Sequence, residues 1–287
     1  MQKLASGLIW RDAPSVQSAS EPNSHAPRGA PSEVQRTDAP APAVEIVDLH
    51  KSFSGRKVLN GINLKVPRGT VTVILGGSGS GKSVLMKHVI GLLKPDSGQV
   101  LIDGEDIVSL SGAALDKVRR RFGMVFQNSA LFDSMTVGDN VAFPLREHTR
   151  LSPAEIAKKV ADKLELVGLS GIEKRMPAEL SGGMRKRVGL ARAVILDPEI
   201  VLYDEPTTGL DPITTDNVDD MILDASRALG VTSIVISHDI GSAFKIADQL
   251  AFLYQGVIVA HGPPASVRHV THPRVQEFLR TWFEKGS

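Results

Sequence analysis

The stretch Val71-Thr72-Val73-Ile74-Leu75-Gly76-Gly77-Ser78-Gly79-Ser80-Gly81-Lys82-Ser83 decides the fold. Its first five residues are apolar or β-branched and predict a short buried strand. The glycine-rich turn that follows matches the phosphate-binding pattern G-x-x-x-x-G-K-[ST]. Glycine lets a backbone curl tightly enough for several N–H groups to converge on phosphate oxygens. We therefore predict a strand, a nucleotide-binding P-loop, and a helix from about Lys82 to Leu93.

The residue types of this turn also predict individual roles. Lys82 is expected to reach the β- and γ-phosphates, and the Ser83 hydroxyl is expected to ligate Mg²⁺. The positive end of the following helix adds further attraction for phosphate. A chance match of this pattern in a chain of such length has a probability of roughly 1%, and the flanking strand and helix lower it further. The candidate nucleotide ligands are Gly76, Gly77, Ser78, Gly79, Ser80, Gly81, Lys82, Ser83 and Val84.

The composition indicates a globular protein without a nucleic-acid-binding surface. The chain has 287 residues, 42% of them hydrophobic, which suffices for one large domain or two small ones. A net charge of +1 argues against a nucleic-acid partner, and we interpret Arg119-Arg120-Arg121 as a solvated helix end. The absence of cysteine excludes disulfides and thiolate metal sites.

Two further features concern location. No apolar run approaches the roughly 18 residues of a membrane span, and the segment 1–10 is too short and too polar for a secretory signal. We therefore expect a cytoplasmic protein that does not itself span a membrane.

The character of the chain changes near residue 43. Residues 1–43 are rich in Ala, Pro and Ser, and predict a disordered tail, with a docking segment around residues 8–10 as the alternative. Short strands are expected afterwards, and a helical region from about Thr136 to Ala191. Strands and helices then alternate, which predicts a parallel sheet with right-handed crossovers. The expected strands are 44–49, 58–59, 62–66, 100–104, 122–126, 200–203, 232–236, 250–254 and 257–260, and the later helices are 212–229 and 240–247.

The last part of the chain, residues 266–287, predicts an amphipathic helix. Pro273 suits its first turn. This helix packs either on the chain's own body or on a partner subunit, and the sequence leaves both open. Its apolar face holds Val275, Phe278, Leu279, Trp282 and Phe283.

A P-loop alone does not specify a reaction, but carboxylates at the end of a later strand narrow the choice. The apolar run 200–203 ends in Asp204 and Glu205. Parallel sheets bind ligands at the carboxyl ends of their strands, so Asp204 is expected beside the P-loop, binding Mg²⁺ through water. Glu205 is then the candidate that polarises the attacking water. His238, which follows the next strand, is a candidate donor to the γ-phosphate, with a purely structural histidine as the alternative.

Ser181-Gly182-Gly183 opens a second helix and offers another set of free amides and a hydroxyl to an anion. The P-loop already wraps the phosphates of its own chain's nucleotide. A second phosphate-binding helix start is most useful when it faces the nucleotide of another subunit. This predicts a head-to-tail dimer with ATP at both seams.

Taken in order, these motifs resemble those of ATP-binding cassette (ABC) proteins over about residues 44–261. The resemblance implies an α/β fold, a P-loop NTPase of ABC type, with a mostly parallel sheet core, an antiparallel β subdomain and a helical subdomain at about 128–191. The nucleotide-binding domain is then expected to span residues 44–265.

The resemblance also implies roles for single residues. Gln127 looks like the Q-loop glutamine, which senses Mg²⁺ or the γ-phosphate and links to a transmembrane partner. Ser181, Gly182 and Gly183 look like the signature that closes on the opposite subunit's ATP. Asp211 looks like the D-loop aspartate, and Phe53 like the aromatic that stacks on adenine, although a core aromatic explains Phe53 nearly as well. Met184 and Val84 depart from the commonest ABC pattern without removing a phosphate donor.

A narrower resemblance lies in residues 130–149, 180–184, 211–214 and 273–279, which look like the ATP-binding subunit of Mla/Mce-type lipid transport systems. It implies a homodimer of ATPase subunits, an integral membrane permease and an Mce-domain protein as partners, and it admits a small STAS-domain regulator. The cargo would be phospholipid or another hydrophobic molecule, and the chain would lie peripherally on the inner membrane through the permease.

Two alternatives remain. One is a transport ATPase for another cargo, such as amino acids or drugs. The other is a soluble, non-transport ABC protein acting on DNA or ribosomes. Such proteins usually carry tandem cassettes or long coiled-coil insertions, and this sequence has one cassette and neither insertion.

Overall fold

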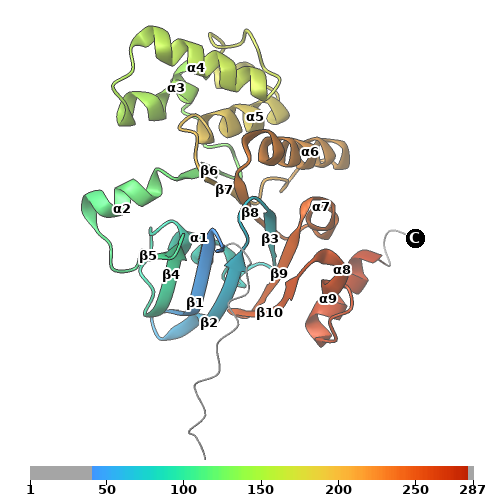
Figure 1. Cartoon of the computed structure of the whole chain (residues 1–287). Helices are drawn as coiled ribbons and strands as arrows, with labels where there is room; N and C mark the ends of the chain where they lie inside the picture. Colours follow the sequence, from blue (N-terminus) through green and yellow to red (C-terminus); the bar gives the residue numbers. More distant parts are fainter. Residues whose placement is uncertain (1–40, 284–287) are drawn as a thin grey trace, which may run out of the picture. The chain divides into compact units, whose positions relative to one another are not determined.

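The computed structural model describes the backbone of residues 41–283 and the side chains through residue 280 (Figure 1). The predicted tail at 1–43 and the docking alternative at 8–10 therefore fall almost wholly outside the described residues, as do the side chains of Trp282 and Phe283. Among the described residues, Ala43 is fully buried and donates its backbone N–H to Val66 O at 2.9 Å.

A mostly parallel sheet forms the centre of this body. Within residues 41–283 it has six strands in the order β10-β9-β3-β8-β7-β6. All neighbours pair in parallel except β10, which is antiparallel to β9. This confirms the predicted parallel core. The strands are β3 (Val71–Leu75), β6 (Phe122–Val125), β7 (Ile200–Asp204), β8 (Thr232–Ser237), β9 (Gln249–Tyr254) and β10 (Val257–Gly262).

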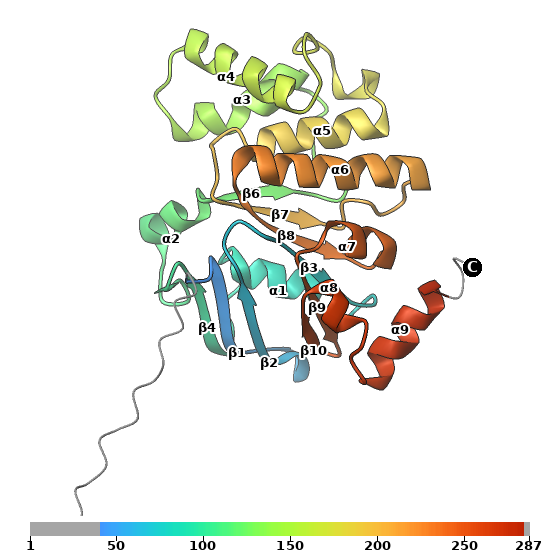
Figure 2. The same ribbon diagram turned by 45° about the vertical axis from the view of Figure 1, so that its right-hand side comes forward.

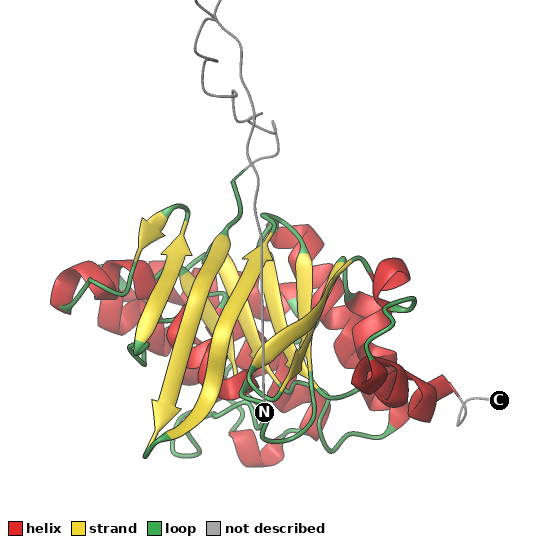
Figure 3. Ribbon diagram, turned by 90° about the horizontal axis from the view of Figure 1, so that it is seen from below, coloured by secondary structure: helices red, strands yellow, loops and turns green. Residues whose placement is uncertain are grey.

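A second sheet, of order β2-β1-β4-β5, is antiparallel throughout. Figure 3 shows its long strands side by side across one face of the structure. Its buried residues share one core with helix α1 and with one face of the central sheet, as the contacts of Ile46, Leu85 and Leu202 illustrate. The predicted antiparallel β region is thus confirmed. Its strands are β1 (Val44–Phe53), β2 (Arg56–Val66), β4 (Ser97–Ile102) and β5 (Glu105–Asp106).

Helix α1 (Lys82–Val89) follows β3 but is shorter than predicted. We expected it to continue to Leu93, and this was wrong. Gly91 has a φ of +65°, a left-handed conformation that ends helices. The backbone N–H groups of Leu92 and Leu93 turn back to the carbonyl of Lys87.

The region expected to be helical contains α3, α4 and α5, which lie together beyond the central sheet (Figures 1 and 2). A capping box starts α4: the Ser152 hydroxyl accepts from Glu155 N at 3.3 Å, and the Glu155 carboxylate accepts from Ser152 N at 2.7 Å. The helices are α3 (Val137–His148), α4 (Pro153–Leu166) and α5 (Gly182–Ala193), with a 3-10 turn at Pro177–Glu179.

A further helix, α2 (Gly112–Arg119), ends at the arginine run as expected, although its bounds were not predicted. Arg119 does end this helix. Arg121, however, is not solvated as we expected: it pairs with Glu199 at 2.8 Å and with Asp103. The start of β7 and the β4–β5 turn bring these carboxylates to it, which only the tertiary fold can do.

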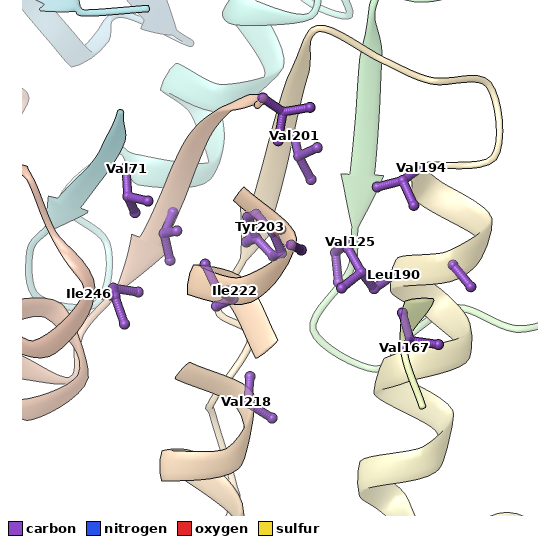
Figure 4. Close-up of a cluster of buried hydrophobic side chains, with 14 of the residues drawn as sticks. Val71, Val125, Val167, Leu190, Val194, Val201, Tyr203, Val218, Ile222 and Ile246 are labelled. Carbon is purple, nitrogen blue, oxygen red and sulfur yellow. The ribbon is translucent and has the colours of Figure 1, made fainter. Parts of the chain in front are cut away.

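The opposite face of the central sheet is covered by α5, α6 (Pro212–Leu229) and α7 (Ile240–Ile246). Figure 4 shows Tyr203 of β7 beside Ile222 of α6, and Val125 of β6 beside Leu190 of α5. Both faces of β7 and β8 are therefore buried, which explains their nearly continuous apolar sequence. Within the described helices, none combines the length and apolar character that crossing a lipid bilayer requires.

The C-terminal helix packs on its own chain in this structure. Its helical part is α9 (Pro273–Phe283), preceded by the short α8 (Pro264–Val267) rather than continuous from residue 266. Val275 and Leu279 are buried in the same core as the central sheet. The Phe278 ring packs edge-on against Phe252 of β9, with centroids 4.9 Å apart.

Asp219 of α6 is a buried carboxyl whose titration should be visible in stability. It is 2% exposed and accepts a hydrogen bond from the Ser242 hydroxyl of α7. Burial raises its pKa to about 6, although Ser242 and Lys245 act in the opposite direction. A folded-state pKa above the unfolded value means that the protonated carboxyl stabilises the fold at low pH, and that this stabilisation is lost as the pH rises through about 6.

We predict that Asp219→Asn removes this dependence, because the amide carbonyl still accepts from Ser242 but does not titrate. Between pH 5 and pH 7.5 the unfolding free energy of the wild type should fall by roughly 1.4 kcal/mol relative to the variant. Urea denaturation at both pH values measures the difference. A difference that does not change with pH would contradict this account.

Candidate nucleotide-binding site

The P-loop runs from the end of β3 to the start of α1, and two of its glycines are required by its geometry. Gly81 has a φ of +108°. A Cβ on Gly76 would lie 2.4 Å from the Leu253 carbonyl oxygen, so no larger residue fits there. The Lys82 ammonium folds back over the loop and donates to Gly76 O at 2.7 Å and Gly77 O at 3.2 Å.

This loop forms one wall of a cavity of about 910 Å³. The rest of the lining comes from segments far apart in the sequence, and it includes three of the predicted site residues, Gln127, Glu205 and His238. The cavity is large enough for a nucleoside triphosphate. Its lining residues are Arg56, Lys57, Val58, Gly77, Ser78, Gly79, Ser80, Gly81, Lys82, Ser83, Val84, Gln127, Glu205, Thr208, His238, Gln255, Gly256 and Phe278.

Glu205 is held from three sides directly after β7. Its carboxylate accepts from His238 Nδ1 at 2.6 Å and from the Thr208 hydroxyl at 3.0 Å, and it lies 3.4 Å from the Lys82 ammonium. Its φ of +49° is unusual for a residue with a side chain and costs about 1 kcal/mol. A carboxylate fixed in this way, opposite a phosphate-binding loop, can orient and polarise a water molecule.

Asp204 is half-buried at the end of β7 and does not itself line the cavity. Burial raises the pKa of its carboxyl, the charge of Glu205 adds to the effect, and Lys82 opposes it. Among residues 41–280 no group of three or more His, Asp or Glu side chains gathers as a metal site.

Phe53 ends β1 and is 44% exposed, so the alternative of a core aromatic is wrong. The Lys51 ammonium lies over this ring, 5.5 Å from its centroid. Phe53 does not line the cavity, although Lys57 and Val58, on the strand that follows, do. Adenine stacking on Phe53 remains a prediction.

Seven lining residues were missed by the sequence reasoning: Arg56, Lys57, Val58, Thr208, Gln255, Gly256 and Phe278. One sequence feature could have identified Thr208: its hydroxyl lies three residues after the strand-end carboxylate of Glu205. Phe278 of α9 is the aromatic that does line the cavity. The periodicity of the apolar residues around Phe278 indicated that one face of this helix is buried. It did not indicate which part of the protein that face packs against.

Ser181 and Asp211 lie on a different cavity, of about 440 Å³, which shares no lining residue with the first. The Ser181 hydroxyl caps α5 by accepting from Met184 N at 3.3 Å, and Asp211 caps α6 by accepting from Thr214 N at 3.0 Å. Gly182 and Gly183, which complete the motif, have open space at the Cβ position. The structure thus brings Lys82, Gln127, Glu205 and His238 together, and it places the Ser181 motif elsewhere.

Comparisons with known proteins agree with this geometry. The sequence profile of the family described as "ABC transporter" matches residues 59–208. The chain is 45% identical over 237 residues to the "Probable ribonucleotide transport ATP-binding protein mkl" of Mycobacterium leprae, covering 83% of this chain and 68% of that protein. It is also 45% identical over 236 residues to the "Intermembrane phospholipid transport system ATP-binding protein MlaF" of Escherichia coli K12, covering 82% of this chain and 88% of that protein.

Two solved structures are similar in fold. The dimeric post-hydrolysis state of the ATP-binding cassette MJ0796 bound to ADP and Pi superposes with a TM-score of 0.69 at 31% identity, covering 77% of this chain and 98% of that chain. CbiO1 from Clostridium perfringens, part of the ABC transporter complex cbiONQ, gives a TM-score of 0.75 at 31% identity, covering 84% and 99%.

Gly256, in the β9–β10 turn, contacts the P-loop. A substitution there tests whether this contact matters for folding and for ATP binding. Its N–H donates to Ser80 O at 3.2 Å, and it receives a hydrogen bond from Asn60 N at 2.8 Å. Its φ is +77°, and a Cβ there would lie 2.3 Å from the Val58 carbonyl oxygen.

We predict that Gly256→Ala weakens both folding and ATP binding, because the turn must move away from Ser80. The matched control is Gly171→Ala, with a φ of +76° and open space around the Cβ, which should lose only about 1–2 kcal/mol of unfolding free energy. Urea denaturation and titration with a fluorescent ATP analogue measure both effects. If both variants lost the same unfolding free energy and the same ATP affinity, the close approach of residue 256 to the Val58 carbonyl would have no effect.

Proposed function

The chain belongs to the ABC transporter family, and from that premise we propose that its ATP hydrolysis powers a separate inner-membrane permease that moves phospholipid. The nucleotide-binding domain is taken as residues 44–265, followed by the C-terminal segment 266–287, of which Val275 and Leu279 are buried against the domain. Hydrolysis itself is a property of the family, and the similar MJ0796 cassette was solved with ADP and Pi.

The observation that carries the mechanism is the separation of the two cavities. Within one chain the Ser181 motif does not reach the P-loop cavity. Two copies arranged head to tail would bring the motif of one subunit to the nucleotide of the other. The free amides at the start of α5 would then close over the γ-phosphate. Dimeric solved structures of the MJ0796 cassette support such an assembly.

The residues of the P-loop cavity take complementary roles in this proposal. Lys82, now bonded to two carbonyl oxygens and close to Glu205, would bind the β- and γ-phosphates instead. Glu205 would polarise the attacking water, and His238 would donate to the γ-phosphate. Because Glu205 and His238 are already bonded to each other, they would act as a preoriented pair.

Magnesium fits the oxygen donors at this edge of the sheet. Ser83 and Gln127 line the cavity, and Asp204 lies beside it with a carboxyl whose pKa is raised by burial and by Glu205, so a cation would relieve that repulsion. These three residues would hold Mg²⁺ together with nucleotide oxygens. The ion would supply positive charge that neutralises the phosphates.

We predict that Glu205→Gln binds ATP but hydrolyses it at least about 100-fold more slowly, since the amide cannot accept the proton of the attacking water. The variant should accumulate as an ATP-bound dimer, detected by light scattering with Mg²⁺ and ATP. Lys82→Ala, as the comparison, should lose ATP affinity and form no dimer. A Glu205→Gln variant that hydrolyses ATP at the wild-type rate would exclude Glu205 as the base.

The permease would bind a largely apolar groove between β6 and the helices α2, α3 and α5, which Asp116, Arg119, Arg120, His148 and Arg192 also line. This groove, of about 760 Å³, holds two aromatic side chains that are strongly exposed, Phe126 at 40% and Phe132 at 42%. The Phe132 ring packs at a tilt of 56° against the Phe143 ring, with centroids 5.1 Å apart. An apolar groove of this kind suits the docking of a short helix from a partner. The chain would thus lie on the inner membrane through the permease, with an Mce-domain protein and a STAS-domain regulator in the same complex.

Phospholipid is the favoured cargo because the chain covers 88% of the MlaF protein, whose name specifies intermembrane phospholipid transport. A second candidate is ribonucleotide, which the name of the mycobacterial relatives specifies at the same identity. The chain spans only about two thirds of the length of those relatives. Cargo contact itself belongs to the partner proteins.

We predict that the tagged full-length chain, purified from detergent-solubilised membranes of its native cells, recovers an integral membrane permease and bound phospholipid. Phe132→Ser should lose the permease. Leu92→Ser is the matched control, since Leu92 is 55% exposed and lies outside the groove. Recovery of ribonucleotide would favour the second candidate, and recovery of ribosomes without any membrane protein would overturn the transport function.

A further inference from the structure

Helix α5, which begins at the Ser181 motif, also carries one buried and one half-buried cation. Lys186 is only 7% exposed, and Arg192 is half-buried. Within the described part of the chain, neither forms an ion pair with a carboxylate. Burial lowers the pKa of both groups. Placing two cations inside a protein without a counter-ion requires other strong acceptors.

Backbone carbonyls provide those acceptors, and they belong to two loops of the nucleotide site. Lys186 Nζ donates to Gln127 O at 3.1 Å and also to Pro206 O, the residue after Glu205. Arg192 donates to Ser129 O and to Ala130 O, each at 2.8 Å. Side chains of α5 thus form hydrogen bonds with both the loop that follows β6 and the loop that follows β7.

The turn formed by residues 127–130 needs this support. Ser129 and Ala130 have φ values of +60° and +46°, two successive left-handed residues that are not glycine. Ser129 is buried, and Gly189 of α5 approaches it so closely that a Cβ on Gly189 would lie 3.2 Å from the Ser129 Cβ. Packing against α5 and the two cations therefore stabilise a strained turn.

The same turn connects the two functional surfaces. Gln127 lines the nucleotide cavity, and Phe132, five residues later, lines the apolar groove. The Arg192 guanidinium lies 5.8 Å from the centre of the Phe132 ring. Asn140 of α3, fully buried, fixes Phe132 by accepting from its N–H at 2.8 Å and donating to its carbonyl at 3.0 Å.

We propose that Lys186 is a positioning residue that fixes Gln127 and Glu205 relative to the Ser181 helix, so that these parts of the site move as one unit. Lys186 would not touch the nucleotide; it would act through the carbonyls of Gln127 and Pro206. Arg192 would extend the unit to the groove through Ser129, Ala130 and Phe132. This inference rests on the proposed ATPase function and deepens it.

The test compares three variants of the full-length chain. Lys186→Met shortens the unbranched side chain by one atom and removes its donors, Lys186→Gln has the same reach but restores a donor, and Lys158→Met is a control at an exposed lysine of α4. Steady-state ATP hydrolysis gives kcat and KM, and amide hydrogen exchange reports on residues 127–132.

For Lys186→Met we expect kcat to fall about tenfold while the KM for ATP stays within twofold, because the P-loop contacts are unchanged. Exchange in residues 127–132 should become faster. Lys186→Gln should recover most of the lost kcat, and Lys158→Met should match the wild type. A merely stabilising role would instead lower the melting temperature and leave kcat of the folded protein unchanged.

Three results would overturn the proposal: a wild-type kcat in Lys186→Met, a raised KM with unchanged kcat, or a kcat for Lys186→Gln as low as that of Lys186→Met. Absence of ATP hydrolysis in the wild type and in Lys158→Met alike would be a different result. It would refute the ATPase function itself rather than the role of Lys186.

Discussion

The parallel pairing of β3, β8 and β7 brings three loops to one edge of the central sheet. Leu75 pairs with Ser237, and Asp204 pairs with Ile236, so the three strands end at nearly the same level. The P-loop, Glu205 and His238 follow directly from these ends. A slip of one residue in any pairing would turn the strand's side chains to the other face and displace the loop. The site therefore depends first on strand register, which is enforced by burial of both sheet faces.

Polar side chains are concentrated at the end of this apolar sheet. There they form hydrogen bonds and an ion pair with one another, in place of hydrogen bonds with water. Lys82 is 7% exposed and is surrounded by two carbonyl oxygens and the carboxylate of Glu205. Glu205 is in turn bonded to Thr208 and His238. Electrostatic interactions are stronger in such partly buried surroundings than in water. The arrangement keeps the cation and the carboxylate oriented in advance, so little reorganisation is needed when phosphate replaces the carbonyl oxygens.

Helix α5 links the separate parts of the molecule because each section of it meets a different loop. Its first turn presents the Ser181 motif on one cavity, while Lys186 and Arg192 hold the 127–130 turn beside the other. An α-helix is stiff over this length, since each turn is fixed by its own hydrogen bonds. Movement of the 127–130 turn therefore requires movement of α5. Because α5 is stiff, a displacement at the groove on one side of it is expected to displace the nucleotide cavity on the other side.

The sequence by itself determined the elements whose signals are local. The strand 71–75 was predicted to the residue, and the helix predicted near 212–229 has these bounds. In the structure, Asp211 caps its start and Gly230, with a φ of +62°, follows its end. The phosphate-binding pattern and the strand-end carboxylates were likewise readable, since residue type and spacing within a few positions define them.

Only the tertiary structure decided which distant residues meet. It paired Arg121 with Glu199 and brought Phe278 to the nucleotide cavity. It also gave Lys186 its two carbonyl partners, one of them 59 residues away along the chain. Spacing along a helix or strand specifies which face a side chain occupies, but the atoms that this face meets are set by the packing of other elements. The role of a buried cation such as Lys186 follows from those atoms, and so it became visible only in the folded chain.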